Sequence, residues 1–322
     1  MCLPVVVPGG GYSGKRRLVL KPELGLVFIN YHSARWLQYA LESLAASEPE
    51  LSREVVIVDN GSASRTEELM LRTLGAQFGA RVLFLKRNVG YGAAANRGII
   101  YTQADFVAVC NPDIRFTDGS LSRLVGLLNS CPDAGVVSPQ LFYPDGTPQP
   151  SCRRLPRLRY VLSGRRSPLV RIFPGLGPAR EFLYLDLWQK EEPVPVEAVI
   201  GTVMVFRRQA FTKVGGFDEG YFMFAEDLDI CYRLRKDGWQ VFLEPRAKVI
   251  HYYGAVRRRW RRKTEYQRVR GLHRFFTRRR GFFSRLLLTP AFAGYYFMIE
   301  ALGLVGLGEF EYSWQGMGSE KV

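Results

Sequence analysis

Short apolar segments alternate with segments of helical spacing along the first third of the chain, and this alternation constrains the fold more than any other feature. The apolar segments read as buried strands because they are short and rich in β-branched residues. They are "LGLVFINY" (24–31), "EVVIVDNGS" (54–62), "RVLFLKR" (81–87) and "DFVAVCNPD" (105–113). Helical spacing follows in the segments between them, with Ser33 and Ser62 as expected N-caps. The alternation predicts an α/β domain built on a sheet wrapped by helices.

Polar residues follow each of the four predicted strands. In such sheets, ligands bind beyond the carboxyl ends of the strands, so these residues are expected to form one rim. They are Asn30-Tyr31, Asp59-Asn60, Asn88 and Asn111-Pro112-Asp113. The rim predicts the position of a binding site.

The second half of the chain returns to regular structure after a segment rich in Pro, Gly and Arg (155–195), which we interpret as a variable loop region. A strand is expected in "EAVIGTVMVFRR" (197–208), a helix in "FAEDLDICYRLRKDGW" (224–239), and closing strands ending near His251. The helix begins with three acids, Glu226, Asp227 and Asp229, directly after an aromatic run. Acids favour the helix macrodipole, but a carboxylate beside aromatic side chains is also partly desolvated, which raises its pKa and suits a general base.

Taken singly, the polar motifs leave alternatives open. "NPD" (111–113) has oxygen ligands suited to a divalent cation, but taken alone the three residues more often form a strand-ending turn. "NVGYGAAANRG" (88–98) is neither a dinucleotide fingerprint nor a phosphate-binding P-loop. His251 is either a metal or phosphate ligand or a structural residue, and no Ser-His-Asp arrangement is defensible.

Several stretches, in order and at matching separations over about 24–254, resemble the successive motifs of the family 2 inverting glycosyltransferases. These are "VFINYHSARWLQYALESL", "VVIVDNGSAS", "NVGYGAAANRGI", "FVAVCNPDI" and "GTVMVFRRQAFTKVGGFDEGYFMFAEDLDICYRLRKDGW". The rhamnosyltransferase-like branch is most similar, since NPD there replaces the more usual DxD. The resemblance implies a GT-A fold, a Rossmann-like mixed sheet flanked by helices, with a nucleotide-sugar donor and a divalent metal, Mg²⁺ or Mn²⁺.

The resemblance also implies a role for individual residues. Asp227 would be the catalytic base, with Glu226 as its neighbour. Asp229 is not part of this set: two residues later on a helix it points away, and we expect it to serve the helix dipole or a salt bridge. The donor nucleotide would contact Asn30, Tyr31, Asp59, Asn88, Gly90, Asn96 and Asn111. Asp113 and His251 would hold the metal, and Gly201, Phe222 and Phe224 would lie on the acceptor side. With Asn111 in place of the first acid of DxD, a water would replace one carboxylate ligand.

The net charge of +15 is concentrated near the C-terminus. Residues 257–285 hold thirteen Lys or Arg against one acid, Glu265. Such a segment could meet nucleic acid, anionic lipid or phosphorylated ligands, and the aromatics among its arginines favour a membrane interface. Residues 286–308 are apolar but interrupted by Pro290, so we expect them to lie on a membrane, with a single span as the alternative. One of Arg257–Arg262 could also clamp the donor diphosphate.

The five cysteines form no CxxC pair, which argues against a disulfide framework or zinc site and fits a reducing cytosol. The expected organisation is a flexible lead-in without a secretory signal (1–22), a GT-A domain (23–255) and a basic helical extension (256–322). The expected protein is an inverting hexosyltransferase of cell-envelope polysaccharide synthesis, peripheral on the inner face of the plasma membrane. It would move rhamnose from dTDP-rhamnose to a lipid-linked or glycan acceptor. The alternatives are a nucleotidyltransferase on a related sheet and a nucleic-acid-binding protein using the basic tail, although no nucleic acid is expected as a partner.

Overall fold

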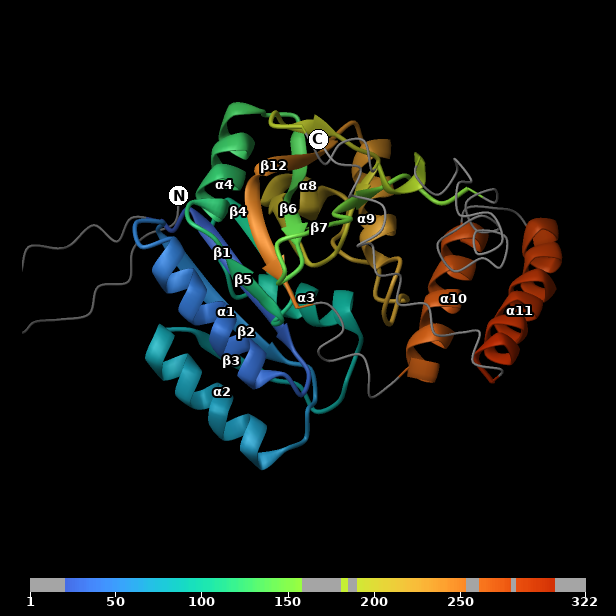
Figure 1. Cartoon of the computed structure of the whole chain (residues 1–322), viewed down its shortest axis with the longest axis horizontal. Coiled ribbons are helices and arrows are strands. Elements are labelled where there is room, and N and C mark those ends of the chain that lie inside the picture. Colours follow the sequence, from blue (N-terminus) through green and yellow to red (C-terminus); the bar gives the residue numbers. More distant parts are fainter. Residues whose placement is uncertain (1–20, 158–180, 185–189, 253–260, 279–281, 305–322) are drawn as a thin grey trace, which may run out of the picture.

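The computed structural model describes residues 21–157, 181–184, 190–252, 261–278 and 282–304. A ten-stranded mixed sheet forms its centre, and helices cover both faces (Figure 1). The elements of the first half are β1 (Leu24–Asn30), α1 (Ala34–Ser47), β2 (Arg53–Asp59), α2 (Arg65–Phe78), β3 (Arg81–Phe84), α3 (Tyr91–Ile99), β4 (Phe106–Cys110), β5 (Ile114–Phe116), α4 (Ser120–Ser130) and β6 (Ala134–Phe142). The alternation predicted for the first third is confirmed.

The second half adds short strands, four described helices and one long strand. These elements are β7 (Pro148–Gln149), β8 (Cys152–Arg153), β9 (Val194–Pro195), β10 (Ala198–Val199), β11 (Val203–Arg207), α8 (Arg208–Lys213), α9 (Glu226–Lys236), β12 (Gln240–His251), α10 (Arg261–Thr277) and α11 (Phe282–Leu304). The expected loop region 155–195 lies largely outside the described residues, as do most of the lead-in and Arg257–Arg259.

Strand order in the main sheet is β3-β2-β1-β4-β11-β6-β12-β5. The first four strands are parallel, and β11 pairs antiparallel with both β4 and β6. Because β1, β2 and β4 run in the same direction, their polar carboxyl ends meet at one edge, as expected. β8 and β10 form a separate two-stranded sheet.

Two hydrophobic clusters lie on opposite faces of the sheet. One packs α1, α2 and α4 against one face, and the other packs α3, α8 and α9 against the opposite face. β1 contributes alternate residues to the two clusters, Leu26 and Phe28 to the first and Val27 and Ile29 to the second. This two-sided burial explains why the strand is apolar throughout instead of alternating.

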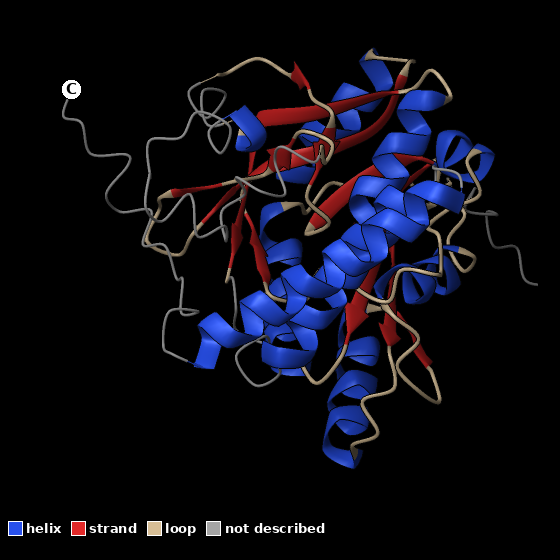
Figure 2. Cartoon of the chain, turned by 90° about the vertical axis from the view of Figure 1, so that its right-hand side faces the viewer, coloured by secondary structure: helices blue, strands red, loops and turns tan. Residues whose placement is uncertain are grey.

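The C-terminal helices α10 and α11 pack against each other. They lie on the right-hand side of the molecule in Figure 1, which is the side that faces the viewer in Figure 2. α10 also contacts the α/β core. Phe275 of α10 belongs to the cluster around α9, and its ring meets that of Tyr232 edge to face. The boundary expected near residue 255 therefore separates segments of sequence whose side chains share a core. Among the helices described, none combines the length and apolar character needed to cross a bilayer.

Candidate functional site

The carboxyl ends of β1 and β2 are joined by a buried polar network. The Asn30 amide donates to Asp59 Oδ1 at 2.9 Å and to Glu67 Oε1 at 3.0 Å, and Asp59 also accepts the Ser62 backbone N–H at 3.1 Å. Asn30 is completely buried, so it orients Asp59 instead of facing solvent. Tyr31, the next residue, is half-buried at the same edge.

The N-caps in this network differ from the expectation. Ser33 lies at the N-cap of α1, but its hydroxyl donates to Asn30 Oδ1, and Glu67 Oε1 accepts the Ala34 N–H instead. The N-cap of α2 is Ser64, whose hydroxyl accepts the Glu67 N–H, so Ser62 was the wrong serine. Ser62 instead contacts Asp59, because the rim polar network competes for its hydroxyl.

The loop before α3 is held by a second set of amides. Asn60 Nδ2 donates to Asn88 Oδ1 at 3.1 Å and to the Gly90 carbonyl at 3.2 Å, while Asn60 Oδ1 accepts the Val89 N–H at 2.9 Å. Gly90 has φ +95°, and a Cβ there would lie 2.5 Å from the Phe222 carbonyl oxygen. Asn88 and Gly90 thus join the β2 end to the loop that precedes α9.

Asn96 was also expected at the nucleoside pocket, but its side chain is hydrogen-bonded to the backbone of Phe217. Its side chain donates to the Phe217 carbonyl at 2.9 Å and accepts the Phe217 N–H at 3.0 Å. These contacts give Asn96 a structural role in fixing the turn after α8, and its donor-binding role stays a prediction.

Asp113 directly precedes β5, and His251 is the last residue of β12. The pairing of these two strands brings the two side chains together. His251 Nε2 lies 3.6 Å from Asp113 Oδ1, and both side chains are buried. His251 Nδ1 donates to Gln149 Oε1 at 2.7 Å, since that amide oxygen can only accept. Nε2 is therefore the ring nitrogen on the Asp113 side, as in metal-binding histidines oriented by an outer hydrogen bond.

This pair fits a divalent cation with few protein ligands. The described residues hold no group of three His, Cys, Asp or Glu side chains arranged around one point. Mg²⁺ typically binds one or two protein carboxylates and takes its remaining ligands from water and substrate phosphates. Asp113 supplies one such carboxylate, with His251 beside it. Asn111, which follows β4, is anchored by its N–H to the Thr202 carbonyl at 2.8 Å.

Asp227 lies in the first turn of α9 and accepts hydrogen bonds from three donors in the described part of the chain. Arg153 Nη2 donates to its Oδ2 at 2.5 Å, the Gly201 N–H to Oδ2 at 3.1 Å, and the Leu228 N–H to Oδ1 at 2.7 Å. Gly201 is thus placed directly beside Asp227. A Cβ on Gly201 would lie 3.5 Å from the Asp227 Cβ.

The acidity of Glu226 is strongly altered by its surroundings. Burial raises the pKa of Glu226 to about 8, and the neighbouring Asp227 charge adds to this effect. Its Oε2 has no hydrogen-bond partner among the described residues. The neutral form of Glu226 is therefore favoured. The desolvated carboxyl with a raised pKa, which was expected of the general base, is found at Glu226, the neighbour of Asp227.

Tyr91, at the start of α3, lies near the acids at the start of α9 and near Asp113. Its hydroxyl donates to the Gly201 carbonyl at 2.9 Å. Burial raises the pKa of Tyr91 well above its usual range, and nearby Cys110, Glu226, Asp227 and Asp113 raise it further. The Tyr91 phenol stays protonated and lies near both the predicted base and the predicted metal ligand.

Asp229 has a purely structural environment. It is completely buried, accepts Arg233 Nε at 2.6 Å and accepts the Tyr221 hydroxyl at 3.3 Å. The expected salt bridge within the helix is confirmed.

The aromatic run before α9 is held in an unusual backbone conformation. Phe224 and Ala225 have φ +67° and +66°, a left-handed region that costs non-glycine residues free energy. α10 packs directly against them, because a Cβ on Gly271 would lie 2.5 Å from the Phe224 carbonyl oxygen. The half-buried Phe222 supplies its carbonyl to the Tyr91 N–H at 2.9 Å.

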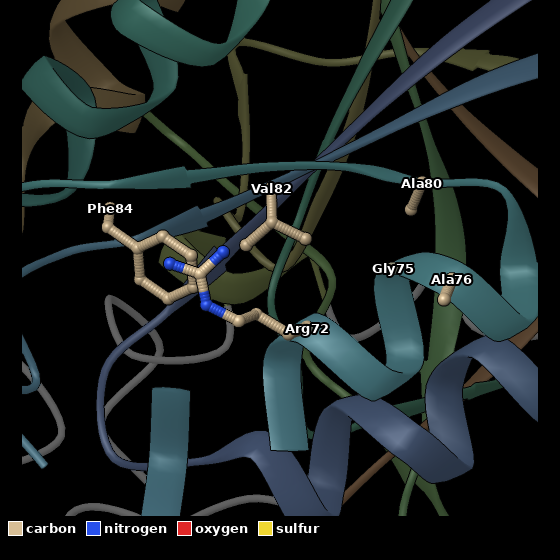
Figure 3. Close-up of a pocket in the computed structure, with 6 residues that line it drawn as sticks. All are labelled: Arg72, Gly75, Ala76, Ala80, Val82 and Phe84. Carbon is tan, nitrogen blue, oxygen red and sulfur yellow. The ribbon is translucent and has the colours of Figure 1, made fainter. Parts of the chain in front are cut away.

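A shallow hollow of about 410 Å³ lies elsewhere, between α2 and the edge strand β3 (Figure 3). Its lining is apolar except for Arg72, whose guanidinium stacks 4.8 Å from the Phe84 ring and pairs with Glu68 at 2.9 Å. No carboxylate or histidine lines it, so it lacks the groups that the chemistry of the rim requires.

Sequence reasoning missed Arg153, Gln149 and Tyr91. Arg153 and Gln149 belong to two-residue strands in a stretch without periodicity, where no pattern marks a functional residue. Tyr91 lies within the glycine-rich motif that was singled out, so its position next to Gly90 was the available signal.

Comparisons with known proteins show which families and relatives this chain resembles. The model of Glycosyl transferase family 2 matches residues 26–215, and that of Glycosyl transferase family group 2 matches residues 180–310. An N-acetylglucosaminyl-diphospho-decaprenol L-rhamnosyltransferase of Mycobacterium tuberculosis is 33% identical over 241 residues, covering 71% of this chain and 76% of that protein. The rhamnosyltransferase WbbL of Escherichia coli is 23% identical over 268 residues, covering 79% and 93%.

Among solved structures, the fold is similar to that of the mannosyltransferase PcManGT from Pyrobaculum calidifontis, determined in complex with GDP-Man and Mn²⁺. The TM-score is 0.54 at 17% identity, and the match covers 82% of this chain and 66% of that one. This likeness supports the GT-A fold.

Proposed function

The chain belongs to glycosyl transferase family 2, and from that membership we propose that it transfers a hexose, with inversion, from a nucleotide-sugar donor to a hydroxyl group of a lipid-linked or polysaccharide acceptor. That the protein is a glycosyltransferase follows from the family itself. The single observation that carries the mechanism is the buried acid pair Glu226–Asp227 at the start of α9, with Gly201 at hydrogen-bond distance from Asp227. Membership decides against the nucleotidyltransferase alternative.

In this mechanism Asp227 accepts the proton of the acceptor hydroxyl. The hydroxyl oxygen forms a bond to the anomeric carbon from the face opposite the leaving group, and the bond from that carbon to the diphosphate oxygen breaks with its electron pair leaving on the diphosphate. A general base of this kind contributes about 10²–10⁴-fold to the rate. Neutral Glu226 avoids placing a second negative charge beside Asp227.

Donor binding is proposed for the rim formed by β1, β2 and β4. Asp59, oriented by Asn30, and Tyr31 would contact the nucleoside, and the backbone at Gly90 would approach it closely. Asp113 and His251 would hold Mg²⁺ or Mn²⁺, which supplies positive charge to the leaving diphosphate when bound. The Mn²⁺ in the mannosyltransferase complex supports a metal in this fold.

The leading donor is dTDP-rhamnose, and the leading acceptor is a polyprenyl-diphosphate-linked sugar. Support comes from the two relatives, both rhamnosyltransferases, of which one is named for an N-acetylglucosaminyl-diphospho-decaprenol substrate. Such an acceptor lies in a membrane, and the protein would have to approach the bilayer surface.

The C-terminal helices are proposed to make that approach, at an anionic membrane facing the cytoplasm. α11 exposes large apolar side chains, and its sequence follows the Arg-rich segment. The exposed residues are Phe283, Leu286, Leu287, Phe297 and Met298. A helix with apolar side chains and flanking arginines is suited to lie in the interface of anionic lipids.

A screen of nucleotide sugars for release of nucleoside diphosphate tests this proposal. The full chain is incubated with dTDP-rhamnose, UDP-sugars and GDP-mannose plus a polyprenyl-diphosphate-linked acceptor, with and without Mn²⁺ or Mg²⁺. We expect acceptor-dependent release from one donor, strongest with dTDP-rhamnose and dependent on metal. Absence of acceptor-dependent release from every donor would contradict the proposal.

A further inference from the structure

Arg153 is a charged residue of the site that the mechanism above does not use. It lies in β8, whose pairing with β10 (Arg153 opposite Ala198) positions it near Gly201, which follows that strand. Its Nη2 is 2.5 Å from Asp227 Oδ2, and about a quarter of its side chain is exposed. The guanidinium therefore stands between solvent and an almost completely buried carboxylate.

The guanidinium is only half-paired. Nε and Nη2 point from the same edge of the planar group, which is the edge that binds two oxygens of a carboxylate or phosphate side by side. Nη2 donates to Asp227 Oδ2, whereas Asp227 Oδ1 accepts the Leu228 N–H and is not available to Nε. Nε is buried and has no hydrogen-bond partner among the described residues. An unpaired buried donor is costly, so this edge is suited to a further oxygen ligand.

Arg153 also limits access to the predicted base. For Asp227 to take a proton, the acceptor hydroxyl must reach one of its oxygens. The other two donors to Asp227 are backbone N–H groups of Gly201 and Leu228, which are fixed by the fold. Of the three, the Arg153 side chain is the donor that can rotate away, and it needs an anion to receive it.

We propose that Arg153 is a substrate-binding residue that pairs with Asp227 between turnovers and moves to a substrate diphosphate when the acceptor hydroxyl binds. The inference rests on the proposed function, because that reaction brings diphosphate into the site. Two oxygens of one phosphate would fill both Nε and Nη2. When Arg153 moves from the Asp227 carboxylate to the phosphate, the acceptor hydroxyl can reach Asp227. Because this movement needs the phosphate, Asp227 becomes accessible only when substrate is bound.

The diphosphate could belong to the donor or to a lipid-linked acceptor, and two measurements separate these sources. For the donor, binding of dTDP in the presence of Mn²⁺ is measured by calorimetry. For the acceptor, KM and kcat are measured with farnesyl-diphosphate-linked N-acetylglucosamine and with octyl N-acetylglucosaminide, which lacks phosphate. The variants are Arg153→Met, Arg153→Lys and the control Arg157→Met, which removes a guanidinium that is 56% exposed and pairs with Glu197 at 3.8 Å.

A charge-assisted hydrogen bond to phosphate corresponds to about a ten- to hundredfold effect. If the donor is the source, we expect Arg153→Met to raise the Kd of dTDP by about that factor. If the acceptor is the source, we expect it to raise the KM of the diphosphate-linked acceptor by about that factor. In the second case, KM and kcat for octyl N-acetylglucosaminide should be the same as in the wild type. Arg153→Lys should recover part of the loss because it keeps the charge but not the two-pronged edge, and Arg157→Met should match the wild type.

Two results would overturn the inference while leaving the proposed function standing. One is an active wild type with Arg153→Met unchanged in all three measurements. The other is an equal loss with both acceptors and unaltered dTDP binding, which marks a structural role. Thermal unfolding of each variant identifies misfolding. If Arg153→Met does not fold, the test uses Arg153→Lys: wild-type dTDP binding and wild-type transfer to both acceptors by that folded variant would overturn the inference. Absence of transfer by the wild type removes the proposed function and this inference together.

Discussion

Two adjacent acids, Glu226 and Asp227, lie in different environments because their partners differ. Asp227 is matched by the Arg153 guanidinium and two backbone N–H groups, whereas Glu226 is buried beside the Asp227 charge with its Oε2 unpaired among the described residues. The macrodipole at the start of α9 favours both acids. Asp229, two residues later, completes the turn as a structural ion pair with Arg233. The helix start and the proposed catalytic site are therefore the same place.

Glu226 makes the stability of the protein depend on pH. Its pKa is raised from 4.5 to about 8 in the folded chain, so between these values the folded state holds a proton that the unfolded state has released. Stability therefore falls as pH rises through this window, by at most about 1.4 kcal/mol per pH unit. Glu226→Gln should remove this dependence, so its free energy of unfolding relative to wild type increases from pH 5 to pH 8. Urea unfolding at each pH measures it, and a pH-independent difference would exclude the raised pKa.

Gln149 is expected to control metal affinity through His251. Removing an outer hydrogen bond to a ligating histidine typically lowers metal affinity by about 10–100-fold. Gln149→Met keeps the length of the side chain but loses the acceptor for His251 Nδ1–H. Mn²⁺ titration of dTDP binding should show this loss, while Gln38→Met should show none, because Gln38 is a half-buried residue of α1 that contacts Glu42 of the same helix. Equal Mn²⁺ affinity in all three proteins would remove His251 from the metal site.

At the scale of elements, the site depends on the contact between the loops that precede α3 and α9. Tyr91 N–H donates to the Phe222 carbonyl, and Gly90 leaves room for that carbonyl to approach. α10 supports the same loop from the other side through Gly271, and Arg274 pairs with Asp218 at 3.0 Å. The left-handed backbone at Phe224 and Ala225 is therefore held between α3 and α10.

Gly90→Ala should push apart the loops that precede α3 and α9. The added Cβ meets the Phe222 carbonyl oxygen at 2.5 Å and also occupies a positive φ. Gly79→Ala is a matched control, because Gly79 has φ +62° but nothing within 4 Å of its Cβ position. The control should lose about 1 kcal/mol of stability from backbone strain alone. Gly90→Ala should lose more, together with most of its transferase activity. Equal effects in the two variants would argue against the loop contact.

The same elements show which features were predictable from sequence. β1, β2 and β4 were found because a strand buried on both faces is apolar throughout and ends where polar residues begin. The acids at the start of α9 were found because acidic residues there stand against an aromatic run. The N-cap of α2 was misassigned because Ser62 and Ser64 both precede the helix, and the choice depends on Asp59 from another strand.

At the scale of the whole molecule, the site is assembled from both halves of the sequence. β1, β2 and β4 supply the proposed donor side, whereas α9 and β12 supply the proposed base and the histidine. The Arg153–Asp227 contact spans 74 residues and the Gln149–His251 contact spans 102, and neither follows from local periodicity. The resemblance to the family located the ordered motifs, but partners that lie between motifs required the three-dimensional arrangement.

The most direct test of the account is single-turnover transfer by Asp227→Asn, measured beside its affinity for dTDP. We expect the rate of sugar transfer to fall by about 10³-fold while dTDP affinity is unchanged, because the amide keeps the shape of the side chain but accepts no proton. Asp237→Asn, at the other end of α9, should transfer sugar at the wild-type rate. Wild-type transfer by Asp227→Asn, or a loss of dTDP affinity as large as the loss of rate, would contradict the assignment of Asp227 as the base.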